Sequence, residues 1–359
     1  MPASSGGTAA LQVLGSGSSL PGPPLSTSEL LTKLASHLPV GAAAVARRIA
    51  RRLGIDTRHV ARALSEPVEG VRPNDAAPQL AARAVATALE QAWLDVSQLQ
   101  FLIGHTATPH MPLPSNTAWT ADVLRYAGPH VELRQACTGF AAAALIANGL
   151  IATSMSPVAL VGSETGSVFL DPRRVIDEPD QLVNLVQMGD GAGAMILGPV
   201  LDPAASRLEC LYFGSLGLGR APGLMQSVGG SMQPQVQGGG PPHFAHDFVQ
   251  IRKSGLDLLR AGLDAAEAQG VTRDSVDWFL PHQANGRMAA VCAEHLQLPA
   301  QRVVCDANVL GNLGSAAIWV SLDRLRRSGR LALGDRVLVL GAEATKFMFG
   351  GFLYVHGRS

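Results

Sequence analysis

Residues 157–164 read PVALVGSE and residues 336–343 read RVLVLGAE, so the chain contains the same pattern twice: an apolar run, a glycine, a small residue and a glutamate. A second apolar run that ends at a histidine lies upstream of each, FLIGH at 101–105 and FLPH at 279–282. Nearly the same number of residues separates the two runs in both copies. Short apolar runs bounded by turn residues are typical of buried strands. The repeat therefore predicts a fold made of two like halves.

A small-residue helix start lies between the two runs of each copy, ACTG at 136–139 and GNLG at 311–314. In a fold of two like halves, corresponding helix starts lie near the pseudo-twofold axis. The histidine that follows the second-half strand belongs to the same end of the fold. We therefore expect Cys137, His282 and Asn312 to converge in one cavity.

Strand and helix signals alternate along both halves, which predicts an α/β fold with helices sandwiched between sheets. We expect a strand over 11–20, a long helix over 74–93 opened by an Asn or Asp cap, a tight turn at 189–193 and a strand over 302–305. The predicted division is a first half at 11–200, a connecting strand and Gly/Pro-rich flap at 201–244, and a second half at 245–359.

The charge of the chain is balanced, with 28 basic and 28 acidic residues and no long run of either sign. This argues against nucleic acid or an anionic membrane as the main partner. Only 16% of residues are charged, which favours an oligomer. Residues 137–163 contain no charge and are long enough for a membrane span. Pro157 and several polar residues interrupt them, so we expect a buried helix over 138–153 and a buried strand over 158–162 instead.

The four cysteines, Cys137, Cys210, Cys292 and Cys305, include no C-x-x-C pair, so nothing in their spacing supports a zinc site or a thioredoxin-like motif. The N-terminus lacks the basic start and apolar run of a signal peptide. We expect free thiols and a cytoplasmic protein.

Cys137 follows a predicted strand and opens a predicted helix. The unsatisfied N–H groups of a helix start favour a thiolate, which makes Cys137 a candidate nucleophile. The alternative is a buried structural cysteine, the more common role for an isolated cysteine.

His282 ends a predicted buried strand and is followed by Gln283-Ala284-Asn285, which we expect to cap the next helix. Such a histidine can donate to a carbonyl oxygen, or it can be a satisfied core residue. Asn312 lies between glycines at a helix start, where it is either a simple cap or a second carbonyl donor. His105 holds the matching place in the first copy, and we expect it to be structural.

These residues carry a family resemblance. ACTGF around Cys137, LPHQAN around His282 and GNLGSAA around Asn312 resemble the Cys-His-Asn triad of the β-ketoacyl-acyl carrier protein synthase III family, in the thiolase superfamily. GSGSSLP at 15–21 and GIDTR at 54–58 resemble further segments of that family. The resemblance implies a thiolase-like fold, with two pseudo-repeated halves in a five-layer αβαβα arrangement.

The resemblance also implies a reaction. Cys137 would take an acyl group from a thioester, and His282 and Asn312 would hold the carbonyl of a malonyl (or 3-oxoacyl) thioester while its α-carbon attacks the acyl group. With a malonyl thioester the attacking carbanion forms as carbon dioxide leaves, which makes the condensation decarboxylative. Neither a metal nor a redox cofactor is implied. The implied partners are acyl carrier protein, acyl and malonyl thioesters and a second copy of the chain, in fatty acid or polyketide-type biosynthesis.

Four further residues gain roles from the resemblance. Arg287 matches a position where the family places a basic residue that faces the acidic carrier. Leu113 matches a residue that closes the acyl pocket of the opposite subunit. Phe347 and Gly350 lie in the loop and strand that border the nucleophile, where we expect contact with substrate.

The chain departs from the family pattern in two places. Residues 27–53 contain no tryptophan, although relatives that use coenzyme A commonly clamp the adenine with one there. This favours a carrier-bound acyl donor. The glycine-rich loop near the C-terminus is replaced by GAEATKFMFGG at 341–351, which favours a specialised substrate.

Two other functions remain open on the sequence. The first is an acyltransferase on the same scaffold, which passes the acyl group from Cys137 to an alcohol or amine without decarboxylation. The second is a non-catalytic partner that binds a carrier protein and stabilises another synthase.

Overall fold

The computed structural model describes residues 9–64, 70–72, 74–226 and 244–358. Within this part of the chain, one mixed sheet runs in the order β11-β12-β13-β8-β1-β7-β6-β4-β5. Its strands are β1 (Leu11–Ser19), β4 (Phe101–His105), β5 (His130–Leu133), β6 (Val158–Glu164), β7 (Gly191–Pro199), β8 (Arg207–Ser215), β11 (Trp278–Pro281), β12 (Arg336–Glu343) and β13 (Met348–Val355). Two short pairs lie apart from it, β2 (Leu25–Ser26) with β3 (Thr57–Arg58) and β9 (Leu224–Met225) with β10 (Ala245–His246).

The sheet consists of two half-sheets that repeat one pattern. In the first half, β4 is parallel to β6 and β6 is antiparallel to β7; in the second, β11 is parallel to β12 and β12 is antiparallel to β13. The halves meet edge to edge where Leu11 pairs with Leu208 and Gln12 with Arg207. β8 pairs along its length with β13, so it belongs to the second half-sheet although it lies within 201–244. The prediction of two like halves is confirmed.

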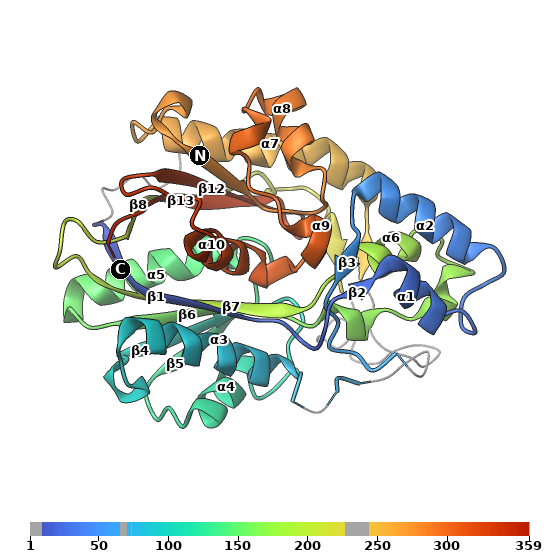
Figure 1. Cartoon of the computed structure of the whole chain (residues 1–359), viewed down its shortest axis with the longest axis horizontal. Helices are drawn as coiled ribbons and strands as arrows, with labels where there is room; N and C mark the ends of the chain where they lie inside the picture. The colour runs from blue at the N-terminus through green and yellow to red at the C-terminus, as the bar shows by residue number, and fades with distance from the viewer. Residues whose placement is uncertain (1–8, 65–69, 73, 227–243, 359) are drawn as a thin grey trace.

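The helices complete the five layers. They are α1 (Thr27–Lys33), α2 (Ala42–Leu53), α3 (Ala77–Ala92), α4 (Asn116–Leu124), α5 (Gly139–Ser154), α6 (Gln181–Gln187), α7 (Phe248–Glu267), α8 (Met288–Leu296), α9 (Ala307–Leu310) and α10 (Ala317–Arg327). α5 and α10 form the central layer, and each contacts strands of both half-sheets. α3 packs on the outer face of the first half-sheet and α7 on that of the second (Figure 1). The αβαβα arrangement predicted from the resemblance is confirmed.

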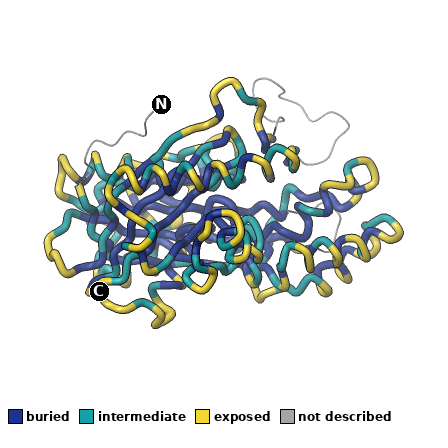
Figure 2. Tube along the Cα trace, turned by 90° about the horizontal axis from the view of Figure 1, so that it is seen from above, coloured by how far each residue is buried: buried dark blue, intermediate teal, exposed yellow. Residues whose placement is uncertain are grey.

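The central layer is buried because its helices are built from apolar and small residues. Phe140, Ala143, Ala144, Ala147 and Ile151 place α5 in a core that also contains Trp319 of α10. Figure 2 shows the buried residues in the interior of the molecule and the exposed ones around its outside. The uncharged stretch 137–163 is thus α5 followed by β6, and no helix of the described residues has the length and hydropathy that a membrane span requires.

Four expectations about local structure need correction or comment. α3 begins after Ala76 with no side-chain cap, because Asp75 instead pairs with Arg72. The predicted turn at 189–193 is largely strand, since β7 begins at Gly191. The predicted strand at 302–305 is only an isolated bridge from Phe279 to Val303. Most of the predicted flap, from residue 227 to 243, lies outside the described residues.

Candidate functional site

Cys137 lies two residues before α5, in the turn that leads from β5 into the helix. Cys137 is a free cysteine of intermediate exposure, measured over the whole residue. The next residue, Thr138, donates its backbone N–H (2.9 Å) and its hydroxyl (2.7 Å) to Oε2 of Glu343. Glu343 is the last residue of β12 and is buried. The first half's nucleophile candidate is therefore held by a strand of the second half.

His282 lies at the end of the neighbouring strand. It follows β11, which is parallel to β12, and its backbone N–H donates to the carbonyl of Leu340 at 2.7 Å. Leu340 precedes Glu343 by three residues, and the ring of Phe140 in the first turn of α5 packs against Gly341 between them. The structure therefore anchors both Cys137, through Thr138 and Glu343, and His282, through Leu340, to the last residues of β12.

The imidazole of His282 is buried, with 6% of the residue exposed, and its Nδ1 has no hydrogen-bond partner among the described residues. Burial lowers the pKa of His282 to about 4, so the ring is neutral at pH 7. A neutral imidazole keeps one N–H to donate and one nitrogen to accept. His282 can therefore donate a hydrogen bond to a carbonyl oxygen without carrying a charge.

Asn312 is held between the halves. Its backbone N–H donates to Gln187 (2.7 Å) and its carbonyl accepts from Gly189 (3.0 Å), both near the start of β7. Its side-chain Oδ1 accepts the N–H of Gly314 at 2.9 Å. With Oδ1 engaged in this way, Nδ2 is the atom left to donate. Asn312 thus closes the local turn to Gly314, and among the described residues its amide Nδ2 makes no hydrogen bond, so it can make a second contact.

The turn after Asn312 is fixed by a second buried glutamate. Glu164, the last residue of β6, accepts the backbone N–H of Ser315 (2.9 Å) and its hydroxyl (2.8 Å) through Oε2. Ser315 thus occupies the place in the second half that Thr138 occupies in the first. The residue that corresponds to Cys137 is therefore Gly314, and Asn312 lies two residues before it rather than in register with it.

The electrostatics of Cys137 differ from the sequence-based expectation. Burial raises the pKa of the Cys137 thiol well above its usual value, the charges of Glu343 and Glu164 raise the pKa further, and only the residue's own backbone N–H lowers it. This direction is opposite to the one expected from the helix start, because Glu343, which bonds Thr138 there, and Glu164, which bonds Ser315, both bring negative charge near the thiol.

The two residues predicted near the nucleophile contact other groups. Gly350 pairs with Gly341, and a Cβ on it would lie 2.8 Å from the Cβ of Ala141, so it lets α5 approach the sheet. The ring of Phe347 is fully buried and lies beneath the guanidinium of Arg220 at 3.9 Å. These contacts assign packing to both residues, and contact with substrate stays a prediction.

Leu113 and Arg287 lie on the surface, as their predicted roles require. Leu113 is 84% exposed and precedes a cis proline. Arg287 is exposed, and its guanidinium donates to the carbonyl of Arg51, the last turn of α2, at 3.2 Å.

α2 extends the charge of Arg287 into a basic surface that the sequence reasoning missed. The buried face of α2 is formed by Ala42, Ala46 and Ala50, four residues apart, so the intervening arginines face outward. The exposed arginines of α2 are Arg47, Arg48, Arg51 and Arg52. With Arg287 they form what we call the α2 basic face. Its signal in the sequence is the segment ARRIARR at 46–52, within a chain of balanced charge.

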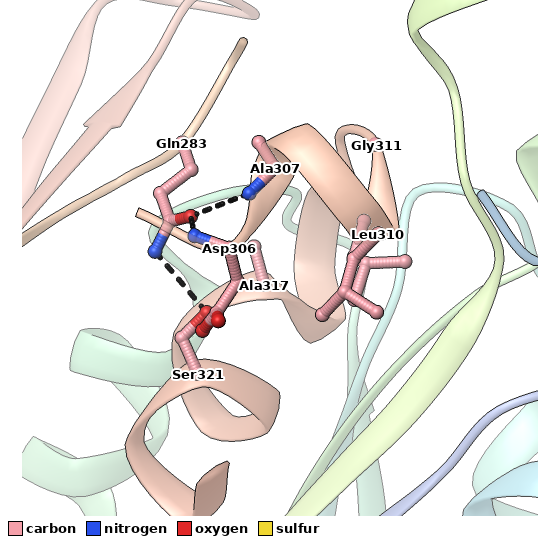
Figure 3. Close-up of a pocket in the computed structure, with 8 residues that line it drawn as sticks. Gln283, Asp306, Ala307, Leu310, Gly311, Ala317 and Ser321 are labelled. Carbon is pink, nitrogen blue, oxygen red and sulfur yellow. Dashed lines mark hydrogen bonds between the residues drawn. The ribbon is translucent and has the colours of Figure 1, made fainter. Parts of the chain in front are cut away.

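Gln283 is a second residue whose role the sequence reasoning missed. Its side-chain carbonyl accepts the backbone N–H groups of Asp306 and Ala307, the latter at 3.0 Å, and its amide donates to Ser321 at 3.1 Å (Figure 3). Gln283 therefore ties the end of β11 to α9 and α10. Within the predicted capping segment 283–285, it is Asn285 whose side chain accepts the N–H of Arg287, at 2.9 Å, directly before α8. A small recess lined by Gln283, Ala307, Leu310 and Ser321 adjoins these contacts.

His105 is confirmed as a structural residue. Its Nε2 accepts the indole N–H of Trp319 at 3.1 Å, and its ring packs against the backbone of Gly139 and Gly162. Burial lowers the pKa of His105 to about 3. Of the two repeated histidines, the first is bonded to the core and the second is free to donate.

Comparison with known proteins identifies the family. Residues 131–216 match the 3-oxoacyl-[acyl-carrier-protein] synthase III family model, and residues 266–353 match the model of that family's C-terminal part. A β-ketoacyl-[acyl-carrier-protein] synthase III of Neisseria meningitidis is 31% identical over 334 residues, which cover 92% of this chain and 94% of that protein.

Solved structures agree with this assignment. AbyA1, described as a tetronic acid condensing enzyme, is 27% identical with a TM-score of 0.82, over 97% of this chain and all of that one. The priming β-ketosynthase of the R1128 polyketide pathway is 26% identical with a TM-score of 0.79, and the match covers 99% of this chain and 98% of that one. The synthase III of Pseudomonas aeruginosa is 26% identical with a TM-score of 0.76, over 97% and 99%. The chain is therefore a member of the β-ketoacyl-acyl carrier protein synthase III family of condensing enzymes, in the thiolase superfamily.

Proposed function

We propose that this protein catalyses a two-step condensation in which Cys137 carries the acyl group and His282 and Asn312 activate a malonyl (or 3-oxoacyl) thioester. In the first step the sulfur of Cys137 attacks the thioester carbonyl. The bond from that carbonyl to the donor sulfur breaks, and the proton of Cys137 leaves with the donor thiol. The product is an acyl-cysteine with no net change of charge.

In the second step the bond between the malonyl carboxylate and its α-carbon breaks and carbon dioxide leaves. The electron pair moves onto the thioester oxygen, where the N–H groups of His282 and Asn312 stabilise the enolate. The α-carbon then attacks the acyl-cysteine, the Cys137 sulfur leaves and takes up a proton, and a 3-oxoacyl thioester forms. We propose that neither step uses a metal or a redox cofactor.

The observation that carries this proposal is the neutral imidazole of His282, whose Nδ1 has no partner among the described residues and whose backbone is bonded to β12, the strand that also holds Thr138, the residue after Cys137. Neutral donors suit an oxyanion that forms and disappears within one turnover, because they bind it without a permanent ion pair.

Half-reactions test the assignment. Intact-mass measurement after incubation with acyl thioesters should detect one acyl group on the wild type and none on Cys137→Ala. Asn312→Ala should still load the acyl group. It should release carbon dioxide from a malonyl group on the carrier protein at least about a hundredfold more slowly than the wild type, because it removes one donor to the enolate oxygen. Acyl loading that persists in Cys137→Ala would remove the cysteine from its role.

We propose that the acyl donor is a carrier protein and that the α2 basic face receives it. Carrier proteins of this reaction class present acidic helices, and the arginines of α2 and Arg287 give a charge-complementary surface. The absence of a tryptophan from residues 27–53 supports the same choice.

We also propose a homodimer in which the edge strand β5 faces a second copy. Large exposed hydrophobic residues gather on β5, on the neighbouring α4 and on the preceding loop, namely Leu113, Trp119, Val123 and Val131. Such a patch on an edge strand marks an interface. Sedimentation should give a dimer for the wild type and a smaller species for Val131→Asp.

Acyl transfer to an alcohol is a second candidate, favoured by the likeness to AbyA1. Tetronic acid is a lactone with a 3-oxo group, so its ring contains an acyl–oxygen bond in addition to carbon–carbon bonds. Carbon dioxide release separates the two candidates: malonyl carrier consumed with one carbon dioxide per product supports condensation, whereas acyl transfer to an added alcohol without it supports the second candidate.

A further inference from the structure

Two buried glutamates bind the two halves of the protein crosswise. Glu164 ends β6 of the first half and holds Ser315 of the second; Glu343 ends β12 of the second half and holds Thr138 of the first. The two contacts match in detail, because in each the Oε2 atom accepts a backbone N–H at 2.9 Å and the hydroxyl of the same residue at 2.7 or 2.8 Å.

The second oxygen of each carboxylate is also matched. Oε1 of Glu164 accepts the hydroxyl of Thr108, and Oε1 of Glu343 accepts the hydroxyl of Thr345. Both glutamates are about 1–2% exposed, so each carboxylate lies in the protein interior with three hydrogen-bond donors. A buried carboxylate of this kind is stabilised only where its donors stay in place, so it fixes the backbone that supplies them.

Each carboxylate fixes a different candidate catalytic residue. The N–H bonded to Glu343 belongs to the residue directly after Cys137. The N–H bonded to Glu164 belongs to Ser315, and the turn that carries it is closed by the bond from Gly314 to Oδ1 of Asn312. A Cβ on Gly314 would lie 2.4 Å from Oε2 of Glu164, so the backbone of this turn rests directly on the carboxylate.

We propose that Glu343 and Glu164 are crossed positioning residues, Glu343 for the nucleophile in the acyl-loading step and Glu164 for Asn312 in the decarboxylation step. This inference rests on the two-step reaction proposed above. Through the crossing, each half of the fold places the catalytic group of the other half, so the two half-reactions depend on separate carboxylates.

The roles of Glu343 and Glu164 can be distinguished because the two carboxylates affect the pKa of Cys137 to different extents. Glu343 and Glu164 are the charges that raise the pKa of Cys137, with Glu343 the larger contributor, while His282 and His105 are neutral neighbours. Glu164 faces Thr108, Ser315 and the charge of Asp190. Removal of the charge of Glu343 therefore lowers the pKa of the thiol, an effect that a purely structural contact would not produce.

The substitutions Glu343→Gln and Glu164→Gln test the proposal in the full-length chain. Glutamine keeps one oxygen for the N–H and hydroxyl of Thr138 or Ser315. Its amide then faces a threonine hydroxyl. The rate of iodoacetamide alkylation against pH reports the thiol, and carbon dioxide release from malonyl carrier reports the second step.

Glu343→Gln should move the alkylation midpoint to lower pH, because it removes the larger of the two charges that raise the pKa of the Cys137 thiol. It should leave the decarboxylation rate within about twofold of the wild type. Glu164→Gln should move the alkylation midpoint less and should slow decarboxylation by about fivefold or more, the effect of weakening a charge-assisted hydrogen bond. If both variants slow both steps equally, or if neither changes either step, the crossed assignment is wrong.

Thr138→Val and Ser315→Ala serve if a glutamine variant does not fold. Each removes only the hydroxyl contact and keeps the backbone N–H. The first should slow acyl loading and spare decarboxylation, and the second should do the reverse; the opposite pattern would overturn the proposal. A wild type that takes up no acyl group and releases no carbon dioxide would contradict the proposed function itself, so the two failures are distinguishable.

Discussion

The indole N–H of Trp319 donates to Nε2 of His105 at 3.1 Å, and both side chains are buried. Trp319 belongs to α10 of the second half and His105 ends β4 of the first, so this bond joins the halves in the central layer. Because Nε2 accepts, the proton of the neutral ring is assigned to Nδ1. His105 therefore contributes to the junction between the halves and not to chemistry.

Trp319→Phe should destabilise the protein by about 2–4 kcal/mol, because it leaves the Nε2 acceptor unpaired and opens a cavity. Urea unfolding followed by circular dichroism measures the loss. Trp93→Phe is the matched control, since Trp93 is 93% exposed and should change stability by less than about 0.5 kcal/mol. Equal effects of the two substitutions would show that the buried bond contributes nothing.

Gly350→Ala should destabilise the protein by about 1–3 kcal/mol, because its Cβ would meet the Cβ of Ala141 at 2.8 Å and push α5 away from the sheet. The same shift moves Cys137, so acyl loading should slow as well. Gly255→Ala in α7 is the control. Its Cβ meets nothing within 4 Å, and replacing a helical glycine should stabilise by about 0.5–1 kcal/mol. A loss of stability without slower loading would separate Gly350 from the nucleophile.

The architecture was predictable because it depends on local sequence patterns. The apolar runs at 157–164 and 336–343 predict β6 and β12, and their repetition predicts a fold of two like halves. The pairing of Thr138 with Glu343 was not predictable, although both residues lie in the quoted motifs. Contacts that cross from one half to the other depend on how the halves pack, which no single run encodes.

The differences at individual residues have the same cause: local sequence patterns do not encode contacts between distant segments. The helix start at Cys137 predicts a thiolate, but the carboxylates that oppose it come from strands far away in the sequence. The segment 283–285 predicts a local cap, and Asn285 does bond Arg287 locally, whereas the partners of Gln283 lie at Ala307 and Ser321. Periodicity locates an element well, but a buried polar side chain chooses its partner by tertiary contact.

Decarboxylation should be nearly independent of pH between about 5.5 and 8, because the pKa of His282 is lowered to about 4 and the ring stays neutral throughout. Protonation begins only as the pH approaches 4. An ordinary histidine would instead change charge near pH 6.5. Carbon dioxide release by Cys137→Ala, which cannot load an acyl group, isolates this step. A midpoint near 6.5 in that profile would refute the assignment of a neutral donor.

Alkylation of Cys137 by iodoacetamide should be slow at pH 7 and should rise steadily up to pH 9 without a plateau, because burial, Glu343 and Glu164 raise the pKa of the thiol. Only the thiolate reacts, so a raised pKa lowers the reactive fraction at neutral pH. Mass-resolved rates for the Cys137 peptide provide the measurement, and free cysteine under the same conditions provides the reference. A rate at pH 7 above that of free cysteine would indicate a thiolate instead.

Arg48→Glu should raise the KM for a carrier-bound acyl donor by about tenfold and weaken its dependence on salt, because it reverses a charge in the centre of the α2 basic face. kcat should change little, since Arg48 lies on the surface of α2 and outside the contacts that hold Cys137. Arg330→Glu changes the same charge beside Trp278, at the opposite end of β11 from His282, and should leave the KM within about twofold. Initial rates with one carrier-bound acyl group at two salt concentrations decide the matter. Equal KM values for the two variants would exclude α2 as the docking surface and leave Arg287 to be tested alone.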